Sequence, residues 1–207
     1  MCETTRISPW YNDGKRMSLK DLTWEHHKNA ERQEFVKIMM SGNIHPKFYA
    51  TFLYNLHPRY DLLEAMGRVH GLFDGIPSVQ RHQAIIADFN HLWKEKEPPQ
   101  ILPSTNEYIA HMKGCMNDPD KLMAHIYTFH MGDLSGGQMI ARKVPGLKSM
   151  FQFEGDIDAI KNKIREKLND DMADEARYAF DSATQLFKEM MELDCEHYLE
   201  QTDNMSE

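Results

Sequence analysis

The sequence contains the stretch His125-Ile-Tyr-Thr-Phe-His-Met-Gly-Asp-Leu-Ser-Gly-Gly-Gln138, in which three glycines fall within six residues. The flanking segments, 124–131 and 139–144, have helix-forming compositions, whereas each glycine costs about 1 kcal/mol relative to alanine inside a helix. We therefore predict a helix that bends at the glycines, where the missing Cβ atoms let a flat ligand approach the main chain. The alternative is an ordinary helix end followed by a turn.

This stretch resembles the distal-helix signature of haem oxygenases, usually Tyr-Thr-Arg-Tyr-Leu-Gly-Asp-Leu-Ser-Gly-Gly-Gln. Nine of the twelve positions match, including every glycine and the aspartate. The resemblance implies that Gly132, Gly136 and Gly137 press against haem. It also implies that Asp133, expected to be ionised at physiological pH, delivers protons through ordered water during catalysis.

The sequence departs from the family pattern at positions of the distal hydrogen-bond network. Phe129 and His130 stand where the family usually has arginine and tyrosine. His57, followed by an unusual Pro58, stands in place of a tyrosine in the second helix. We therefore expect the water arrangement near Asp133 to differ from the family's.

Haem iron needs an axial ligand, commonly a neutral histidine, and the sequence offers 11 histidines. The segment around His27 resembles the family's proximal helix, with a lysine seven residues before the ligand, an alanine three after it and a glutamate four after it. For His27 these positions are Lys20, Ala30 and Glu31. Neighbouring helix residues point about 100° apart, and His26 lacks these offsets, so we predict that His27 binds the iron. Glu31 could accept the ring N–H of His27 or form a surface pair instead.

A basic segment near the end of the chain supplies candidates for the haem propionates. Lys161 and Arg165 share a helix face at i, i+4, and a guanidinium suits a bidentate carboxylate contact. The segment resembles the family's propionate-binding helix, although it also fits an ordinary solvated face. The resemblance adds Lys20 and Tyr127 as further propionate contacts, and Phe180 as a residue that lines the pocket.

Helical patterns cover nearly the whole sequence, without sustained strand alternation or internal repeats. Possible capping boxes at 18–21 and 104–107 predict helix starts, the first for a helix that runs to about residue 40. Asp118 and Asp156 predict two more starts. Pro58 should kink or end the second helix, and the last helix should cover about 172–199.

These patterns predict an all-α protein, and the resemblance implies haem held between a proximal helix and a kinked distal helix. At 207 residues the chain fits a single domain, with flexible tails expected at 1–17 and 200–207.

Composition narrows the class of partner. A net charge of −8 argues against nucleic acid as the main partner. No apolar run approaches the roughly 20 residues that span a bilayer, and the N-terminus lacks a signal-peptide pattern. Cys2, Cys115 and Cys195 form neither a disulfide framework nor a zinc pattern, which suits a reducing compartment. We therefore expect a cytoplasmic protein without a membrane partner.

The resemblance implies a haem oxygenase, in which haem b is both cofactor and substrate. Such an enzyme uses O2 and an external reductant to cleave haem to biliverdin, here expected as the IXα isomer, with CO and free iron. The cofactor carries the chemistry while the protein orients and tunes it. The chain contains no reductase segment, so we expect electrons from a separate protein, ferredoxin.

Three alternative functions would require other features of the sequence. A non-catalytic haem-binding or haem-sensing protein of the same fold would retain His27 but lack a competent distal network. A two-metal carboxylate protein needs Glu-x-x-His pairs on facing helices, and none of the 11 histidines has glutamate three residues before it. Nucleophilic chemistry at Ser135 would need a preceding strand, and none is predicted.

Overall fold

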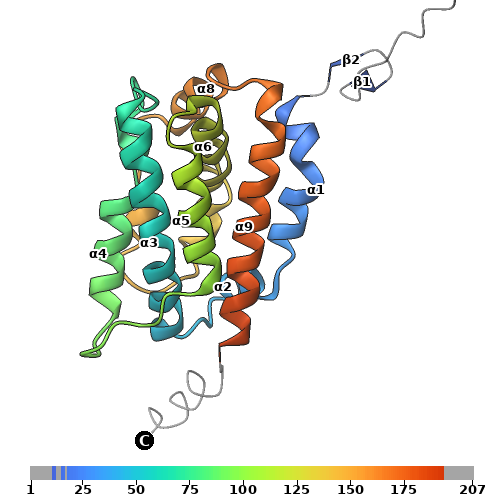
Figure 1. Cartoon of the computed structure of the whole chain (residues 1–207). Coiled ribbons are helices and arrows are strands. Elements are labelled where there is room, and N and C mark those ends of the chain that lie inside the picture. The colour runs from blue at the N-terminus through green and yellow to red at the C-terminus, as the bar shows by residue number, and fades with distance from the viewer. Residues whose placement is uncertain (1–10, 13–14, 17, 194–207) are drawn as a thin grey trace, which may run out of the picture.

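The computed structural model describes residues 11–12, 15–16 and 18–193, which form a bundle of helices (Figure 1). The predicted C-terminal tail, 200–207, and the predicted end of the last helix lie outside the described residues. Most of the predicted N-terminal tail, 1–17, also lies outside them. The described helices are α1 (Leu19–Glu31), α2 (Glu34–Ser41), α3 (Pro46–Val69), α4 (His82–Leu92), α5 (Pro103–Cys115), α6 (Pro119–Leu134), α7 (Gly137–Ile140), α8 (Ile157–Glu166) and α9 (Ala173–Glu192). Short 3-10 helices lie at Pro77–Val79, Ser149–Phe151 and Asp170–Met172, and β1 (Tyr11–Asn12) pairs with β2 (Lys15–Arg16) in an antiparallel hairpin. The predicted all-α class is confirmed.

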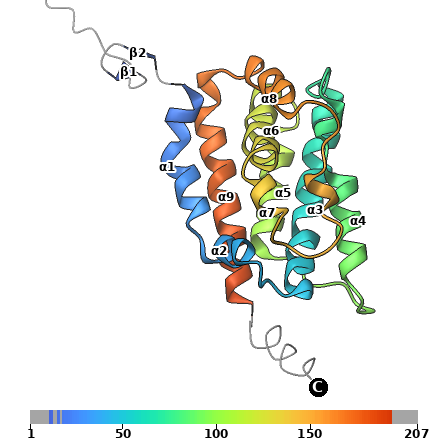
Figure 2. The same cartoon turned by 180° about the vertical axis from the view of Figure 1, so that it is seen from behind.

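Helix α9 joins the two sides of the bundle. It packs against α1 and α2 on one side and against α5 and α6 on the other, while α3 packs against α4, α5 and α6. In the view of Figure 2, α9 runs alongside α1. Buried apolar side chains form two clusters. One is centred on α6 and the first half of α9, and the other surrounds Phe35 of α2 and the start of α3.

The segment predicted to form one helix from residue 18 to about residue 40 forms two helices, α1 and α2, so this prediction is wrong in its continuity. Its start is confirmed, since Ser18 and Asp21 form the capping box. The break lies at Gln33, which has an extended backbone (ψ 146°). The Gln33 side chain folds back and donates to the carbonyl oxygen of Asn29 at 2.9 Å. This break lets α2 leave the axis of α1 and pack against both α9 and α7.

Helix α3 continues through Pro58, so the alternative that the helix ends there is wrong. Proline removes one backbone hydrogen bond of the helix. Buried side chains on both sides of it, including Leu53, Tyr60 and Leu63, hold the two halves of α3 against the core. Tertiary packing therefore outweighs the local cost of the proline.

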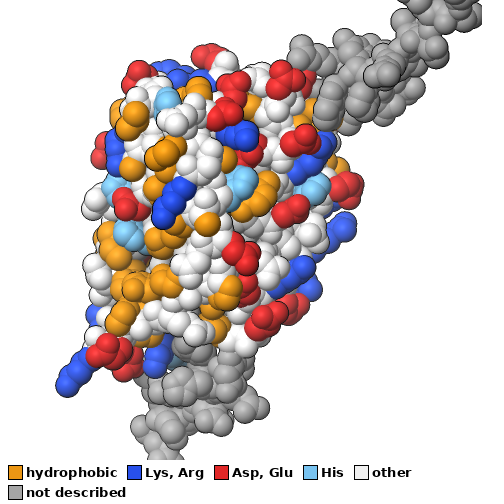
Figure 3. Space-filling view, in the orientation of Figure 1, with side chains coloured by type: hydrophobic (Ala, Val, Ile, Leu, Met, Phe, Trp, Pro, Cys, Tyr) orange, Lys and Arg blue, Asp and Glu red, His pale blue; other side chains and the backbone are white. Residues whose placement is uncertain are grey.

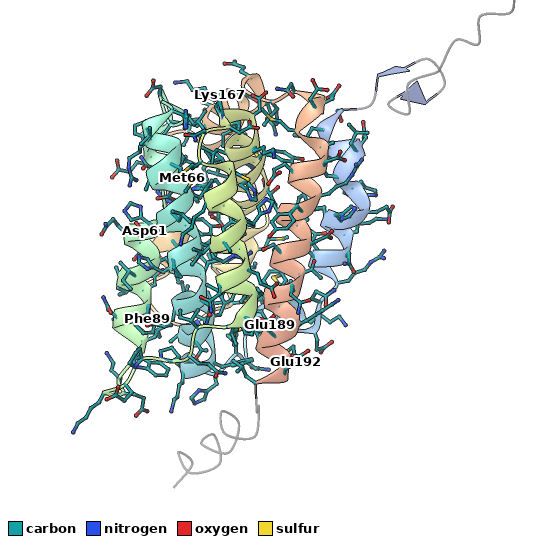
Figure 4. The ribbon with its side chains drawn as sticks, viewed as in Figure 1. Asp61, Met66, Phe89, Lys167, Glu189 and Glu192 are labelled. Atoms are coloured by element: carbon teal, nitrogen blue, oxygen red, sulfur yellow. The ribbon has the colours of Figure 1, made fainter. Side chains whose placement is uncertain are left out.

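The predicted capping box at 104–107 is also wrong. The N-cap of helix α5 lies two residues earlier than predicted, at Leu102 instead of Ser104, and Pro103 is in the first turn. The Ser104 backbone N–H donates to Glu189 Oε2 at 2.9 Å, and Figure 4 shows Glu189 between α5 and α9. A carboxylate from another helix therefore caps α5, where negative charge is favourable. The predicted caps Asp118 and Asp156 are confirmed, with each side chain accepting a backbone N–H of the first turn.

Acidic and basic side chains are interspersed over the face drawn in Figure 3, rather than gathered in a patch of one sign. Among the residues that the structure describes, no helix is both long enough and apolar enough to cross a membrane.

Candidate functional site

The predicted bend in the glycine-rich helix is present. Helix α6 ends at Leu134, the backbone turns at Ser135 (φ −113°, ψ −88°), and α7 begins at Gly137. A Cβ atom built on Gly132 would meet nothing within 4 Å, and one on Gly136 would meet only the Gly132 carbonyl oxygen at 3.9 Å. The main chain at both residues therefore borders open space, as the close approach of a flat ligand requires.

Gly137 has a different environment. A Cβ atom there would lie 2.9 Å from two ring carbons of Phe151. Packing against Phe151 therefore explains why position 137 is a glycine. Gly132 and Gly136, in contrast, border space that a ligand could use.

We expect Gly137→Ala to lower the thermal stability of the ligand-free protein. The added methyl group would clash with Phe151, and overpacking a core typically costs about 1–3 kcal/mol. Gly132→Ala is the matched change in open space. It should preserve or raise stability, because alanine is about 1 kcal/mol better than glycine inside a helix. Thermal unfolding of both variants measures the difference, and equal losses would contradict this assignment.

The predicted axial ligand, His27, lies near the middle of α1 with 39% of its side chain exposed. Its ring makes an edge contact with Phe180 of α9, with ring centres 5.4 Å apart, and stacks on Trp24 at 5.8 Å. Glu31 Oε1 lies 3.4 Å from His27 Nε2, close enough to orient the ring. His26 Nδ1, in contrast, lies 2.7 Å from Asp181 Oδ1 of α9. This hydrogen bond directs the His26 ring towards Asp181 and favours His27 as the ligand.

A contact between α1 and α6 relates His27 to the glycines. The Tyr127 side chain of α6 lies near the Thr23 side chain of α1, which lowers the pKa of Tyr127 against the effect of burial. The two helices run in the same direction (Figures 1 and 2). His27 lies four residues beyond Thr23, a rise of ~6 Å, and Gly132 lies five beyond Tyr127, a rise of ~7.5 Å. The histidine and the open backbone are therefore at about the same level of the bundle.

The predicted propionate contacts lie towards one end of this region. Burial raises the pKa of Tyr127 of α6, and the positive charge of Arg165 opposes that shift. Arg165 lies on α8, which packs against α6. Arg165 also donates to Asn162 Oδ1 at 2.6 Å. The Lys161 side chain is largely covered, with its Nζ 3.9 Å from Asp158. Lys20 lies on the exposed side of α1, with its Nζ 5.9 Å from the centre of the Trp24 ring.

Asp133 is 9% exposed and accepts a hydrogen bond from the Tyr60 hydroxyl at 2.8 Å. Burial raises the pKa of Asp133 to about 7, although His130, Tyr60 and Arg81 oppose the shift. The expectation of a fully ionised carboxylate is therefore corrected, because both forms are populated near neutral pH. A group with this pKa can both donate and accept a proton at neutrality.

Asp133→Asn is expected to change how stability depends on pH. Folding raises the pKa of Asp133 from 3.8 to about 7. The contribution of Asp133 to the free energy of unfolding is therefore largest below about pH 4, where the carboxyl group is protonated, and it is lost as pH rises through about 7. The free energy of unfolding of the unmodified protein, relative to that of the variant, should therefore fall over this range. Urea unfolding at several pH values measures it. A constant difference would contradict the raised pKa.

A buried charge network beside Asp133 could not be predicted from the sequence. Glu64 of α3 is fully buried and pairs with His130 Nε2 of α6 at 2.9 Å and with His82 Nδ1 of α4. The Arg81 backbone N–H donates to the same carboxylate at 2.5 Å. Burial alone would raise the pKa of Glu64, but these hydrogen bonds outweigh it and lower the pKa to about 2. The replacement of tyrosine by His130 was the only signal in the sequence, and it does not identify the partner.

Arg59 was also missed. This residue of α3 is 1% exposed. Its guanidinium lies 4.3 Å from the ring centre of Tyr108 and 5.5 Å from that of Phe129, and it donates to the Ser182 hydroxyl. Phe129 occupies the position of the family's usual arginine, and the cation beside it comes from α3 instead.

These groups fit haem chemically. Open backbone at Gly132 and Gly136 gives room for a flat ring, and His27 offers a nitrogen ligand at the same level. Arg165 and Tyr127 can bind carboxylates at one end. Asp133, one residue from the open backbone, can exchange protons.

Comparisons with known proteins agree with this fit. Residues 16–193 match the family model "Heme oxygenase". "Heme oxygenase 2" of Rattus norvegicus is 29% identical over 202 residues, covering 83% of this chain, which spans 64% of that protein's length. The solved haem oxygenase of Leptospira interrogans is 25% identical with a TM-score of 0.74, covering 84% of this chain and 100% of that one. Haem oxygenase-1 of Synechocystis in complex with haem is 25% identical with a TM-score of 0.73, covering 90% and 94%. This chain belongs to the haem oxygenase family.

Proposed function

We propose that the protein is a haem oxygenase that cleaves haem to biliverdin, CO and iron, using O2 and electrons from a separate donor. The observation that carries the proposal is that His27 lies at about the same height along the bundle axis as the open backbone at Gly132 and Gly136. When bound, haem would supply the iron that activates O2 and the porphyrin that is oxidised. The protein's own groups bind, orient and move protons.

Several of the predicted site residues have defined roles in this proposal, whereas Gly137 is assigned to packing. His27 would hold the iron, with Glu31 and Phe180 orienting its ring. Gly132 and Gly136 would admit the porphyrin to the distal helix. Asp133, held by the Tyr60 hydroxyl, would relay protons through ordered water to the reacting oxygen.

We further propose the IXα isomer of biliverdin as product, ferredoxin as electron donor and a cytoplasmic location. The isomer depends on how the propionate contacts fix the rotation of haem in its pocket. The donor and the location rest on the sequence arguments above, and the donor is tested directly below.

Aerobic turnover tests the activity. Haem is bound to the purified protein, and reduced ferredoxin or ascorbate is added in air. Loss of the Soret band with formation of biliverdin and CO is expected. A Soret band that persists under reductant and air would instead support the haem-binding or haem-sensing alternative. Turnover with ascorbate but not with ferredoxin would retain the oxygenase and remove the proposed donor.

Arg165→Glu is expected to increase the share of biliverdin isomers other than IXα. Reversing this charge would repel a propionate and favour a rotated haem, whereas the affinity for haem should fall only modestly, since an exposed ion pair contributes about 1 kcal/mol or less. Lys163→Glu makes the same charge change on α8, but Lys163 contacts the Gly75 carbonyl oxygen instead. Chromatography of the products of both variants measures the isomers. Identical isomer ratios and haem affinities would remove Arg165 from the site.

A further inference from the structure

Four metal-binding side chains converge on the side of α6 away from the proposed haem site. They are His111 and Cys115 of α5, His125 of α6 and Glu175 of α9, and one ligand atom from each lies within 4.8 Å of all the others. His125 and Tyr127 are two residues apart on α6, about 200° around the helix. Because Tyr127 faces Thr23 of α1, His125 faces the opposite side. The cluster is therefore separate from the residues proposed to hold haem.

The distances within the cluster approach those of a tetrahedral site. Zinc–ligand bonds of about 2.0–2.3 Å imply ligand atoms about 3.3–3.6 Å apart at the tetrahedral angle. Cys115 Sγ lies 3.5 Å from both His111 Nε2 and Glu175 Oε1. Glu175 Oε1 lies 2.5 Å from His111 Nε2 and 2.8 Å from His125 Nε2. Moving the carboxylate outward by somewhat under 1 Å would open these two shorter separations to bonding geometry.

Neighbouring rings hold both histidines in position. The Tyr108 hydroxyl lies 3.2 Å from His125 Nδ1, so it can accept the N–H that a metal-bound histidine presents on its other nitrogen. The His111 ring stacks on Tyr178 with ring centres 3.7 Å apart. These contacts orient the ligand atoms towards one point.

The charge of the ligands also suits a divalent ion in a buried position. His125 is fully buried and Cys115 is 2% exposed. A thiolate and a carboxylate together balance two positive charges, and the two imidazoles are neutral, so the filled site has no net charge. Buried charges are tolerated when they are compensated in this way.

We propose that His111, Cys115, His125 and Glu175 bind one Zn²⁺ ion, which ties α5, α6 and α9 together behind the haem site. Two nitrogens, a sulfur and an oxygen suit this borderline ion. Four protein ligands are typical of a structural rather than a catalytic zinc site. The ion would hold α6, the helix that carries the glycine bend, against its neighbours.

Cobalt substitution tests the proposal in the full-length, haem-free protein without a polyhistidine tag. The Cys2→Ser and Cys195→Ser changes leave Cys115 as the only thiol of the three. One equivalent of Co²⁺ should give a thiolate-to-cobalt charge-transfer band and intense visible bands of tetrahedral cobalt, and Zn²⁺ should displace both. Zn²⁺ should also raise the thermal midpoint, because a ligand that binds only the folded state stabilises it.

The ligand variants separate a metal site from a hydrogen-bonded network. Cys115→Ser should abolish the charge-transfer band, and His111→Ala should weaken Co²⁺ binding at least tenfold and remove the thermal shift. His111 is half-buried, so its variant is expected to fold, which circular dichroism checks. His91→Ala removes an exposed histidine of α4 and should change neither reading. An absent charge-transfer band in the single-thiol protein, or unchanged Co²⁺ binding in His111→Ala, would overturn the proposal and leave the cluster as a hydrogen-bonded network.

Discussion

His27→Ala is expected to reduce haem turnover by at least about 100-fold, because the loss of contacts that merely support a metal ligand already costs about 10–100-fold. The spectrum of bound haem should change at the same time, since the axial ligand would be lost. Added imidazole can enter the space left by the side chain, which is 39% exposed in the unmodified protein. Recovery of both the spectrum and turnover with imidazole would assign the effect to the missing ligand.

His26→Ala is the matched control, one residue away on the same helix. It breaks the hydrogen bond with Asp181, so a small loss of stability is expected, with the haem spectrum and turnover retained. If His26→Ala abolished turnover and His27→Ala did not, the assigned register of α1 would be wrong.

Features specified by neighbouring residues could be predicted from the sequence. The bend after α6 follows from the glycines, and the caps at Ser18, Asp118 and Asp156 each depend on side chains within three residues. The continuous helix at Pro58 could not be predicted in this way, because packing against distant parts of the chain decides it. The same holds for the cap of α5, which comes from Glu189, 85 residues away.

The residues of the candidate site also differ in whether a local sequence pattern or a contact with a distant residue identifies them. The family resemblance identifies His27 and Asp133, since each lies in a recognisable local pattern. The partner of His130 is Glu64, 66 residues earlier in the sequence. Nothing near Glu64 marks it as a buried charge until α3 and α6 are packed together. The zinc ligands proposed above were missed for the same reason, because they come from three helices and lack the spacing of a zinc motif.

Asp133→Ala is expected to bind haem with near-normal affinity and to lose biliverdin formation by about 10²–10⁴-fold, the range for a positioned proton-transfer group. Asp133 follows Gly132 directly in the chain, and its raised pKa of about 7 lets it exchange protons near neutrality. Haem titration and single-turnover assays measure the two effects separately. Asp133→Asn retains the shape and an acceptor for the Tyr60 hydroxyl, so it should fold well and still be inactive.

His130 is the competing candidate for proton delivery, and His130→Ala distinguishes the two relays. His130 is fully buried and its Nε2 is paired with Glu64, whereas Asp133 retains 9% exposure. Removing the imidazole should leave Glu64 as a buried charge with one partner fewer, at a cost of roughly 3–5 kcal/mol in stability. We therefore expect His130→Ala to unfold at lower temperature yet to form biliverdin while folded. Normal biliverdin yield from Asp133→Ala, with the loss confined to folded His130→Ala, would assign the relay to the histidine.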